Sequence, residues 1–326
     1  MISETAIVSK LTRRLIPFMF LLYVVSYLDR INVGFAALQL NKALNFDPAV
    51  FGLGAGLFFI GYFIFEIPSN LIMERVGARV WMARILVTWG LISSAMMFVG
   101  GVAAFYALRF LLGVAEAGFF PGMILYLTYW FPAAARGRAI ARFMTATAIA
   151  GVIGGPISGV LLNLHGIAGL AGWQWLFLIE GIPAIILGFL VFAILPDRPQ
   201  AARWLTAGEK AWIISRLEEE RQAAPDHVST LKEAFGSRRV WMLALIYFAV
   251  IMSFYGVSLW LPQIVSSFSG MSDLLVGFVS AIPYVAASLG MKEFGSPRRA
   301  AMACRTLRIR RCGRLDCRRL FEDSGH

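Results

Sequence analysis

Apolar residues fill long stretches of the chain, and polar residues gather between these stretches. Each apolar block is about twenty residues long, which is the length that an α-helix needs to cross roughly 30 Å of hydrocarbon. Lipid offers the backbone no hydrogen-bond partners, so each block is expected to be a helix. The pattern therefore predicts an all-α polytopic membrane protein. Eight blocks are present, at about 15–37, 50–72, 80–100, 104–131, 139–162, 174–195, 239–262 and 273–291.

Basic residues alternate from one connection to the next. Lys and Arg precede block one, follow blocks two and four, and fill the segment after block six. The other connections hold Lys42, His165 and Asp273 and little else. Because cytoplasmic loops carry an excess of Lys and Arg, we expect residues 1–14 to be a cytoplasmic N-terminus. No small-residue cleavage site follows the first block, so we expect no removable signal peptide.

One long segment, 196–238, interrupts the succession of blocks. Within it, Thr206 and Glu209 have the spacing of a capping box, and Trp212, Ile213 and Leu217 lie on one helical face. This pattern predicts an amphipathic helix at the cytoplasmic surface. Six spans, a loop and further spans are typical of the two halves of a transporter. We interpret 15–195 as an N-terminal six-helix transmembrane bundle and 239–291 as the first two helices of a C-terminal bundle.

The composition agrees with a membrane protein, since 59% of the residues are hydrophobic, only 15% are charged and the mean hydropathy is +0.71. The net charge of +11 could indicate a nucleic-acid partner, but the basic residues lie mostly in loops and in the last stretch of the chain. We expect that they set topology and that no nucleic acid binds. Single cysteines at 304, 312 and 317 do not make a metal site. We find no nucleophile elbow and no phosphate loop, so we expect neither an enzyme nor a cofactor.

Four stretches resemble a known family. They are YLDRINVGFAAL (27–38), GYFIFEIPSNLIMERVGAR (61–79), RFLLGVAEAGFFPG (109–122) and GWQWLFLIEGIPA (172–184). They resemble the major facilitator superfamily and, more narrowly, its anion:cation symporter family, the organic-acid permeases for tartrate, glucarate, galactonate, phthalate and hydroxyphenylacetate. The resemblance covers about residues 10–290. It implies the major facilitator fold, proton-driven symport of a small organic carboxylate by alternating access, and a bacterial-type cytoplasmic (inner) membrane.

A loop signature of the superfamily, Gly-x-x-x-Asp-Arg-x-Gly-x-Arg, has a counterpart after block two. Here it reads Asn70-x-x-x-Glu74-Arg75-x-Gly77-x-Arg79, with Asn and Glu in place of Gly and Asp. The resemblance implies a gating loop that pairs with helix ends and steadies one conformation. The alternative is a basic turn that only sets topology.

Charged residues inside the first block raise the question of function. A charge at the centre of a bilayer costs about 2.5–3.5 kcal/mol or more. On a helical wheel Tyr23, Tyr27 and Arg30 form one stripe, and Asp29 points about 100° away from it. If the stripe lines a cavity, Asp29 faces a neighbouring helix.

Other blocks offer partners for these charges. Arg109 and Glu116 are seven residues apart on one face of block four, and Tyr62 and Glu66 are one turn apart in block two. Each charge could instead be a structural ion pair that locks helices together. Intramembrane charges more often mark substrate or proton paths. For Glu66 and Glu180 a helix-end or packing role is the stronger interpretation.

Binding an organic anion and coupling to protons require different side chains. An organic anion needs a fixed cation, and Arg30 can grip a carboxylate with two hydrogen bonds. Proton coupling needs a carboxylate whose pKa can move across the working range, which favours Asp29 and Glu116, with Arg109 as the partner that adjusts them.

The resemblance implies the same assignment. It places proton coupling at Asp29 and Glu116 and substrate contact at Arg30, Tyr27 and Tyr62. A further polar contact is expected at Thr147, where some relatives carry an amide. The expected partners are a small organic carboxylate, protons and the lipid bilayer, and we infer no obligate protein partner.

Two features leave alternatives open. Gly151, Gly155 and Gly159, with Pro156 between them, predict either close helix packing or a hinge. After Gly290 the chain becomes rich in arginine, so 292–326 is expected to be either a basic, disordered tail or the product of a shifted reading frame. On the second interpretation the permease is truncated after its eighth span, and the alternative to transport is a non-transporting remnant. The nucleotide sequence of the gene would decide between them.

Overall fold

The computed structural model describes residues 4–223 and 231–294, and within these residues the secondary structure is helical without strands. Eight helices of the described chain are long and apolar enough to cross a membrane, as the eight apolar blocks predict. The three cysteines and the tail from residue 295 onward lie outside the described residues. The two interpretations of that tail therefore stay predictions.

The described chain contains eleven α-helices, which differ widely in length. In order they are α1 (Glu4–Ala43), α2 (Pro48–Val76), α3 (Ala78–Ala95), α4 (Val102–Glu116), α5 (Phe119–Thr128), α6 (Ala133–Leu162), α7 (Gly172–Ile194), α8 (Ala207–Ala223), α9 (Leu231–Gly236), α10 (Arg238–Ser269) and α11 (Asp273–Phe294). Short 3₁₀ turns lie at Met96–Phe98, Ile167–Gly169 and Pro199–Ala201.

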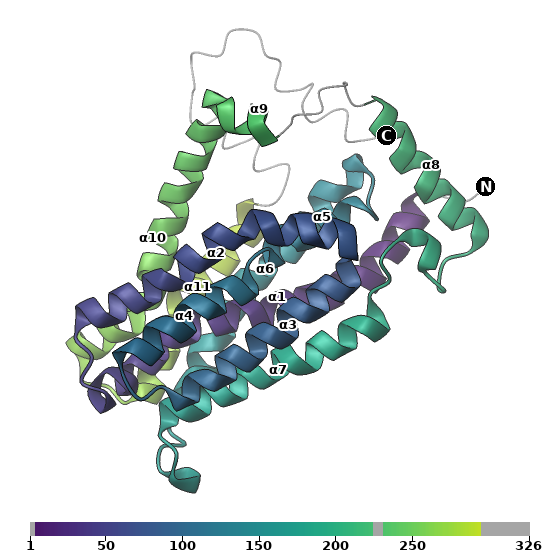
Figure 1. Cartoon of the computed structure of the whole chain (residues 1–326). Helices are drawn as coiled ribbons and strands as arrows, with labels where there is room; N and C mark the ends of the chain where they lie inside the picture. Colours follow the sequence, from purple (N-terminus) through teal and green to yellow (C-terminus); the bar gives the residue numbers. More distant parts are fainter. Residues whose placement is uncertain (1–3, 224–230, 295–326) are drawn as a thin grey trace.

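Helix α1 is the centre of the bundle. It packs against α6, α7 and α10, while α3 packs along α7, α2 along α4 and α11 along α6 (Figure 1). Most side chains in the middle of α1 are buried. The position of this helix explains why its polar residues meet so many partners.

The fourth apolar block is divided into two helices. Helix α4 ends at Glu116, and α5 begins at Phe119. Gly118 between them has φ +80°, a left-handed conformation that glycine adopts without steric cost. A Cβ at Gly118 would also collide with the Ser69 side chain of α2. The break leaves Glu116 as the last residue of α4.

The first helix begins at Glu4, well before the apolar block at 15–37. Its early residues Ile7 and Leu11 are buried, so this first part of α1 also packs inside the protein. Helix α8 has the predicted capping box, since the Thr206 backbone N–H donates to Glu209 Oε2 at 2.8 Å and the Glu209 N–H donates to Thr206 Oγ1 at 3.3 Å. Its predicted apolar face is also confirmed, with Ile213 fully buried.

Helix α10 packs on the bundle over only part of its length. Its buried residues are Tyr255, Ser258, Leu259 and Pro262, all in its second half. A Cβ at Gly34 of α1 would lie 2.6 Å from the Leu259 carbonyl oxygen, so the missing side chain allows this approach. The first half of α10 is exposed and diverges from the other helices toward α9 (Figure 1).

The glycines of α6 form the contact with α11. A Cβ at Gly155 would collide with the Gly277 carbonyl oxygen, and one at Gly159 would lie 3.1 Å from the Asp273 carbonyl oxygen. The packing interpretation of this motif is confirmed. The hinge interpretation stays a prediction, and α6 is continuous through Pro156.

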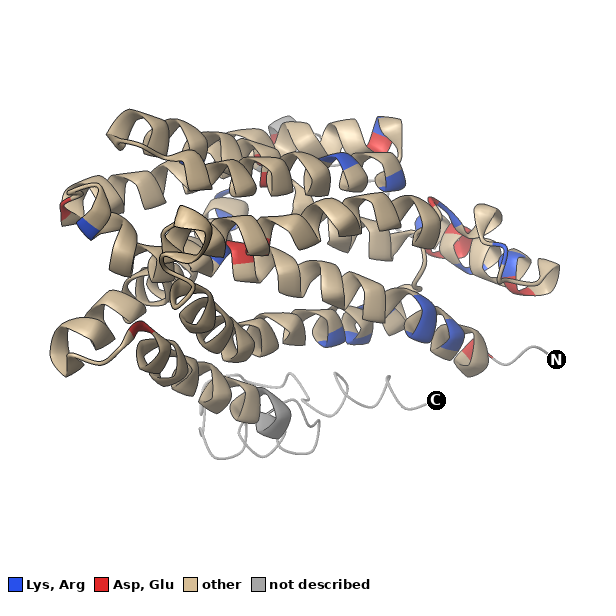
Figure 2. Ribbon diagram, turned by 90° about the horizontal axis from the view of Figure 1, so that it is seen from below, with Lys and Arg blue, Asp and Glu red and all other residues tan. Residues whose placement is uncertain are grey.

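Charged residues gather mostly at the two ends of the helices (Figure 2). The end that carries the N-terminus and α8 holds many of them. The few charges inside the bundle are therefore exceptional, and their surroundings define the candidate site.

Candidate functional site

Arg30 of α1 is the cation at the centre of the candidate site. Its side chain is 9% exposed, and its Nε donates to Glu116 Oε1 at 2.7 Å in a buried ion pair. Its Nη1 donates to the hydroxyl of Tyr255 on α10 at 2.9 Å. The guanidinium carbon lies 4.9 Å from the centre of the Tyr62 ring. Nη2 is buried and has no hydrogen-bond partner among the described residues.

Glu116 holds the other half of this ion pair. Its Oε1 also accepts a hydrogen bond of 2.7 Å from Ser26 Oγ, one turn before Arg30. Its Oε2 is buried and, within the described chain, has no hydrogen-bond partner. One donor on Arg30 and one acceptor on Glu116 are therefore available to a ligand or a proton.

Asp29 points to the other side of α1, toward α3. Its Oδ2 accepts a hydrogen bond of 2.7 Å from Trp89 Nε1, and its Oδ1 accepts bonds from Ser93 and, at 3.1 Å, from Asn32 Nδ2. The helical-wheel prediction that Asp29 faces a neighbouring helix is confirmed. No Lys, Arg or His of the described residues lies within 4.0 Å of its carboxylate.

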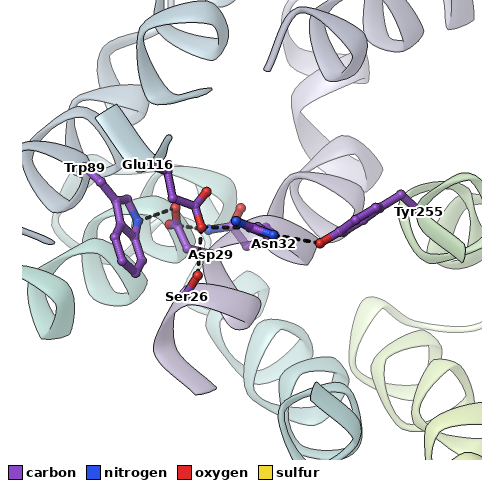
Figure 3. A network of polar contacts seen from close by, with 7 residues as sticks. Ser26, Asp29, Asn32, Trp89, Glu116 and Tyr255 are labelled. Carbon is purple, nitrogen blue, oxygen red and sulfur yellow. Dashed lines mark hydrogen bonds and ion pairs between the residues drawn. The ribbon is translucent and has the colours of Figure 1, made fainter. Parts of the chain in front are cut away.

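Figure 3 shows how these groups converge from different helices. Trp89 reaches Asp29 from one side, Ser26 and Glu116 meet in the middle, and Tyr255 extends from the opposite side. The polar cluster thus lies across the interface between α1, α3, α4 and α10. This arrangement allows proton and anion chemistry on adjacent faces of one helix.

Arg109 lies apart from the ion pair of Arg30 and Glu116. It is buried, its Nε donates to the Gly54 carbonyl oxygen at 3.4 Å, and its guanidinium carbon lies 4.9 Å from the Phe58 ring centre. The ion partner of Glu116 is Arg30. Arg109 and Glu116 share a face of α4, but two turns of helix separate them and each contacts a different neighbour. The role of Arg109 in adjusting the two carboxylates stays a prediction. Arg109 still acts on Asp29 and Glu116 electrostatically.

The predicted substrate residues lie at unequal distances from this centre. Tyr62 stacks on Arg30, as stated above, and Tyr27 is buried with its hydroxyl free of partners in the described residues. Tyr23 packs its ring against Phe120 and Phe143. The Thr147 hydroxyl donates to the Met144 carbonyl oxygen at 2.8 Å within its own helix, and no contact joins it to Arg30 in the described chain.

The predicted gating loop connects α2 to α3. Gly77 has φ +101°, and the Arg79 backbone N–H donates to Asp197 Oδ1 at 2.8 Å. Asp197 follows α7, so it ties the start of α3 to a distant segment. Glu74 lines a surface pocket of about 370 Å³ together with Glu66, Ile67, Asn70, Leu71, Pro121 and Leu125. The gating role itself stays a prediction.

Several residues of the site were not predicted from sequence. The sequence gives a weak indication for four of them: Ser26, Asn32, Trp89 and Ser93. Each can form a hydrogen bond and lies one helical turn from a charged residue or from another member of this set. Tyr255 had none, since it lies 225 positions from Arg30 in a plain apolar block. No three His, Cys, Asp or Glu side chains of the described chain gather as a metal site.

Known proteins are similar to this chain over most of its length. The family model described as Major Facilitator Superfamily matches residues 19–303. A protein of Agrobacterium vitis named "Putative tartrate transporter" is 51% identical over 288 residues, which are 88% of this chain and 66% of that protein. A protein of Pseudomonas putida named "Putative metabolite transport protein NicT" is 49% identical over 89% of this chain and 67% of its own length.

Among solved structures, a bacterial homologue of the human lysosomal transporter Spinster, in an inward-facing and occupied conformation, has a TM-score of 0.67. It is 17% identical and the match covers 87% of this chain and 62% of that one, so it shows the fold alone. The chain spans about two thirds of the length of the curated relatives it matches.

Proposed function

Because the chain belongs to the Major Facilitator Superfamily, we propose that it is a proton-coupled symporter, which takes up a small organic carboxylate by alternating access. It is a multi-pass membrane protein with eight candidate spans. We place it in a bacterial inner membrane with its N-terminus in the cytoplasm, in agreement with the alternation of basic connections.

One observation carries this proposal: the side chain of Arg30 is 9% exposed, and its Nη2 is buried without a hydrogen-bond partner in the described chain. A guanidinium inside a membrane bundle costs free energy unless an opposite charge and hydrogen-bond acceptors satisfy it. Here two of its nitrogens are bound, and the third is buried without a partner among the described residues. A substrate carboxylate would satisfy it through a charge-assisted hydrogen bond.

The ion pair with Glu116 suggests how protons and anion are coupled. When Glu116 takes up a proton its charge disappears, the pair weakens, and the Arg30 Nε becomes available to the anion. The carboxylate would then bind Arg30 through two N–H groups. Loss of the proton would restore the ion pair and favour release of the anion. Asp29, on the other face of α1, is the second carboxylate assigned to coupling.

The arrangement of α10 supports alternating access. Its second half contacts α1 next to Arg30, whereas its first half is exposed. Helix α10 therefore covers the site on the side away from the N-terminus of α1. Toward the N-terminal end of α1, α10 and the other helices separate. In the proposed orientation this corresponds to a conformation that opens to the cytoplasm.

The test is uptake by purified protein in lipid vesicles. The name of the Agrobacterium relative makes labelled tartrate the first probe. With acid outside we expect accumulation that an uncoupler abolishes. Arg30→Lys should reduce the rate about 10-fold or more, because a lysine cannot form the two-pronged contact.

Arg14→Lys is the matched control, because Arg14 is an exposed arginine of the same helix. Uptake no greater than that of empty vesicles, for tartrate and for other mono- and dicarboxylates, would reject the proposed function.

A further inference from the structure

A cavity of about 790 Å³ lies beside α8, at the end of the bundle that carries the N-terminus (Figure 1). Four segments form its wall: the end of α5, the start of α6, the connection from α7 to α8, and the second half of α8. Small-molecule sites have volumes of roughly 300–1,000 Å³, so this cavity can hold a small ligand. None of the residues that surround Arg30 lines it, so it is separate from the candidate transport site.

Contacts between these segments hold the wall of the cavity in place. Glu220 Oε1 of α8 accepts a hydrogen bond of 2.9 Å from the Ala133 backbone N–H at the start of α6. Glu220 Oε2 lies 3.5 Å from Arg136 Nη2, so the charge of this arginine already has a partner. On the other side, Lys210 Nζ donates to the Gln200 carbonyl oxygen at 2.9 Å, which fixes the connection against α8.

Two further arginines on the wall have no carboxylate partner. The guanidinium carbon of Arg198 lies 3.6 Å from the centre of the Tyr129 ring, whose face attracts a cation but carries no net negative charge. No salt bridge among the described residues involves Arg198 or Arg221 of α8. Besides Glu220, the wall includes one carboxylate, Glu218. Three arginines and two glutamates leave an excess of positive charge, which favours an anion.

The position of the cavity and the apolar part of its wall favour a lipid headgroup over a free anion. One candidate span ends at Thr128 and the next begins at Ala133, both on the cavity wall, so the cavity is expected at the depth of the headgroups. Ile214 and Leu217 of α8 line the same cavity, and Ile214 is 37% exposed. A phospholipid brings a phosphate together with apolar carbon, so it would contact both kinds of residue.

We propose that this cavity binds the headgroup of an anionic phospholipid, with the phosphate on Arg198 and Arg221 and the adjoining apolar part along Ile214 and Leu217. Basic pockets at the cytoplasmic ends of membrane helices suit such headgroups, because a desolvated phosphate gains charge-assisted hydrogen bonds there. A bound lipid would attach α8 to the membrane surface. This inference does not depend on which solute the protein carries, so its test needs no transport.

The test measures binding of phosphatidylglycerol to the purified full chain in detergent, with native mass spectrometry counting the bound molecules. Arg198→Gln combined with Arg221→Gln should weaken binding of the first lipid about 10-fold or more, because each arginine attracts the anionic headgroup. Arg203→Gln combined with Arg216→Gln is the matched control. It removes the same charge from the same two segments, at exposed residues that do not line the cavity, and should leave this binding unchanged.

Glu218→Gln covers the case in which the double arginine variant does not fold. Glu218 forms no salt bridge among the described residues, and its removal makes the cavity wall more positive. Phosphatidylglycerol should then bind about 3-fold or more tightly, a gain that a damaged fold would not produce. Glu219→Gln is the matched control, because this neighbouring carboxylate is exposed and does not line the cavity. It should leave binding of the first lipid unchanged.

Two other probes identify the source of the phosphate. Phosphatidylcholine, whose headgroup has no net charge, and inorganic phosphate, which has no apolar part, should each bind about 10-fold or more weakly than phosphatidylglycerol. The inference is overturned if either probe binds as tightly as phosphatidylglycerol, or if Glu218→Gln and the double cavity variant bind this lipid as the wild type does. It is also overturned if the arginine control weakens binding as much as the cavity variant, because the attraction would then belong to the surface charge as a whole.

Discussion

At the scale of single residues, the candidate site is explained by incomplete pairing. Glu116 is buried and the Arg30 side chain is 9% exposed; they pair through one carboxylate oxygen, yet each keeps one polar atom without a partner in the described chain. A buried polar group without a partner costs about 1–3 kcal/mol. The two unpaired atoms lie at the position where, in the proposed mechanism, a proton and an anion would bind.

Replacing Glu116 with Gln tests the role of this carboxylate. Gln keeps the shape of Glu but cannot take up or release a proton. We expect vesicles to lose proton-driven accumulation of labelled tartrate, while exchange of internal for external substrate continues. Glu219→Gln on the exposed surface of α8 is the control. Full accumulation by the Glu116→Gln variant would exclude this residue from coupling.

At the scale of helices, glycines decide where pairs approach closely. In α6 they lie against α11, in α1 against α10, and in α4 against α2, where a Cβ at Gly113 would collide with the Phe58 carbonyl oxygen. Small residues allow this because lipid provides no hydrophobic force between helices, so close van der Waals contact has to hold them together.

Gly155→Ala tests the contact between α6 and α11. The new Cβ would collide with the Gly277 backbone, which cannot rotate away as a flexible side chain could. Overpacking of this kind costs about 1–3 kcal/mol, so the melting temperature in detergent should fall. Gly256→Ala in α10 is the control, since nothing lies within 4 Å of a Cβ there. An equal melting temperature for the two variants would contradict the contact.

Helix α8 ties the ends of two membrane helices together. The Lys10 Nζ of α1 lies 2.7 Å from Glu209 Oε2, and Glu220 accepts the Ala133 backbone N–H at the start of α6 at 2.9 Å. The hydrogen bond from Lys10 holds the pKa of Glu209 below its usual value of 4.5, with the Thr206 N–H contributing in the same direction.

The lowered pKa predicts how this tie depends on pH. The stabilisation is fully present above pH 4.5 and is lost as the pH falls through the lower pKa of the folded state. Glu209→Gln keeps the capping box and removes the charge. Its melting temperature should be slightly below that of wild type at pH 7, for a partly exposed pair worth less than about 1 kcal/mol, and the difference should vanish at low pH.

Glu219→Gln, whose contacts are within α8, is the control for a charge change that leaves the Lys10–Glu209 contact in place. A difference between wild type and Glu209→Gln that stays constant down to the lowest pH would contradict the tie.

At the scale of the whole molecule, α10 and α11 meet the six-helix bundle mainly at the end away from the N-terminus. Asn41 Nδ2 donates to Gln263 at 3.3 Å, and Gln39 donates to Asp273 Oδ2 at 2.7 Å. The contact between Arg30 and Tyr255 lies deeper along the same interface. Alternating access would require these contacts to open while the other end closes.

Cross-linking tests this movement. In a variant whose three cysteines are serines, Asn41→Cys combined with Gln263→Cys should react with a short reducible bifunctional reagent. Uptake of tartrate should then stop and return after reduction, because the two sides of the contact can no longer separate. The two single-cysteine variants serve as controls and should transport with or without the reagent. Continued uptake by the cross-linked protein would show that this end does not open.

Local patterns in the sequence determined the membrane helices, the faces of their charged residues and the cap of α8. Apolar block length determined the eight membrane helices, because a lipid-exposed backbone has to bond within its own segment. Helical periodicity determined that Asp29 and Arg30 face different neighbours, and the spacing of Thr206 and Glu209 determined the cap of α8. Each of these depends on residues within a few turns of one another.

Only the tertiary structure decided which distant groups meet. It paired Glu116 with Arg30, brought Tyr255 to the same guanidinium, and placed Trp89 on Asp29. Periodicity fixes the face on which a side chain lies, but not which helix covers that face or at what depth. Those choices follow from the packing of several helices at once, and in this bundle the glycine contacts set how closely they approach.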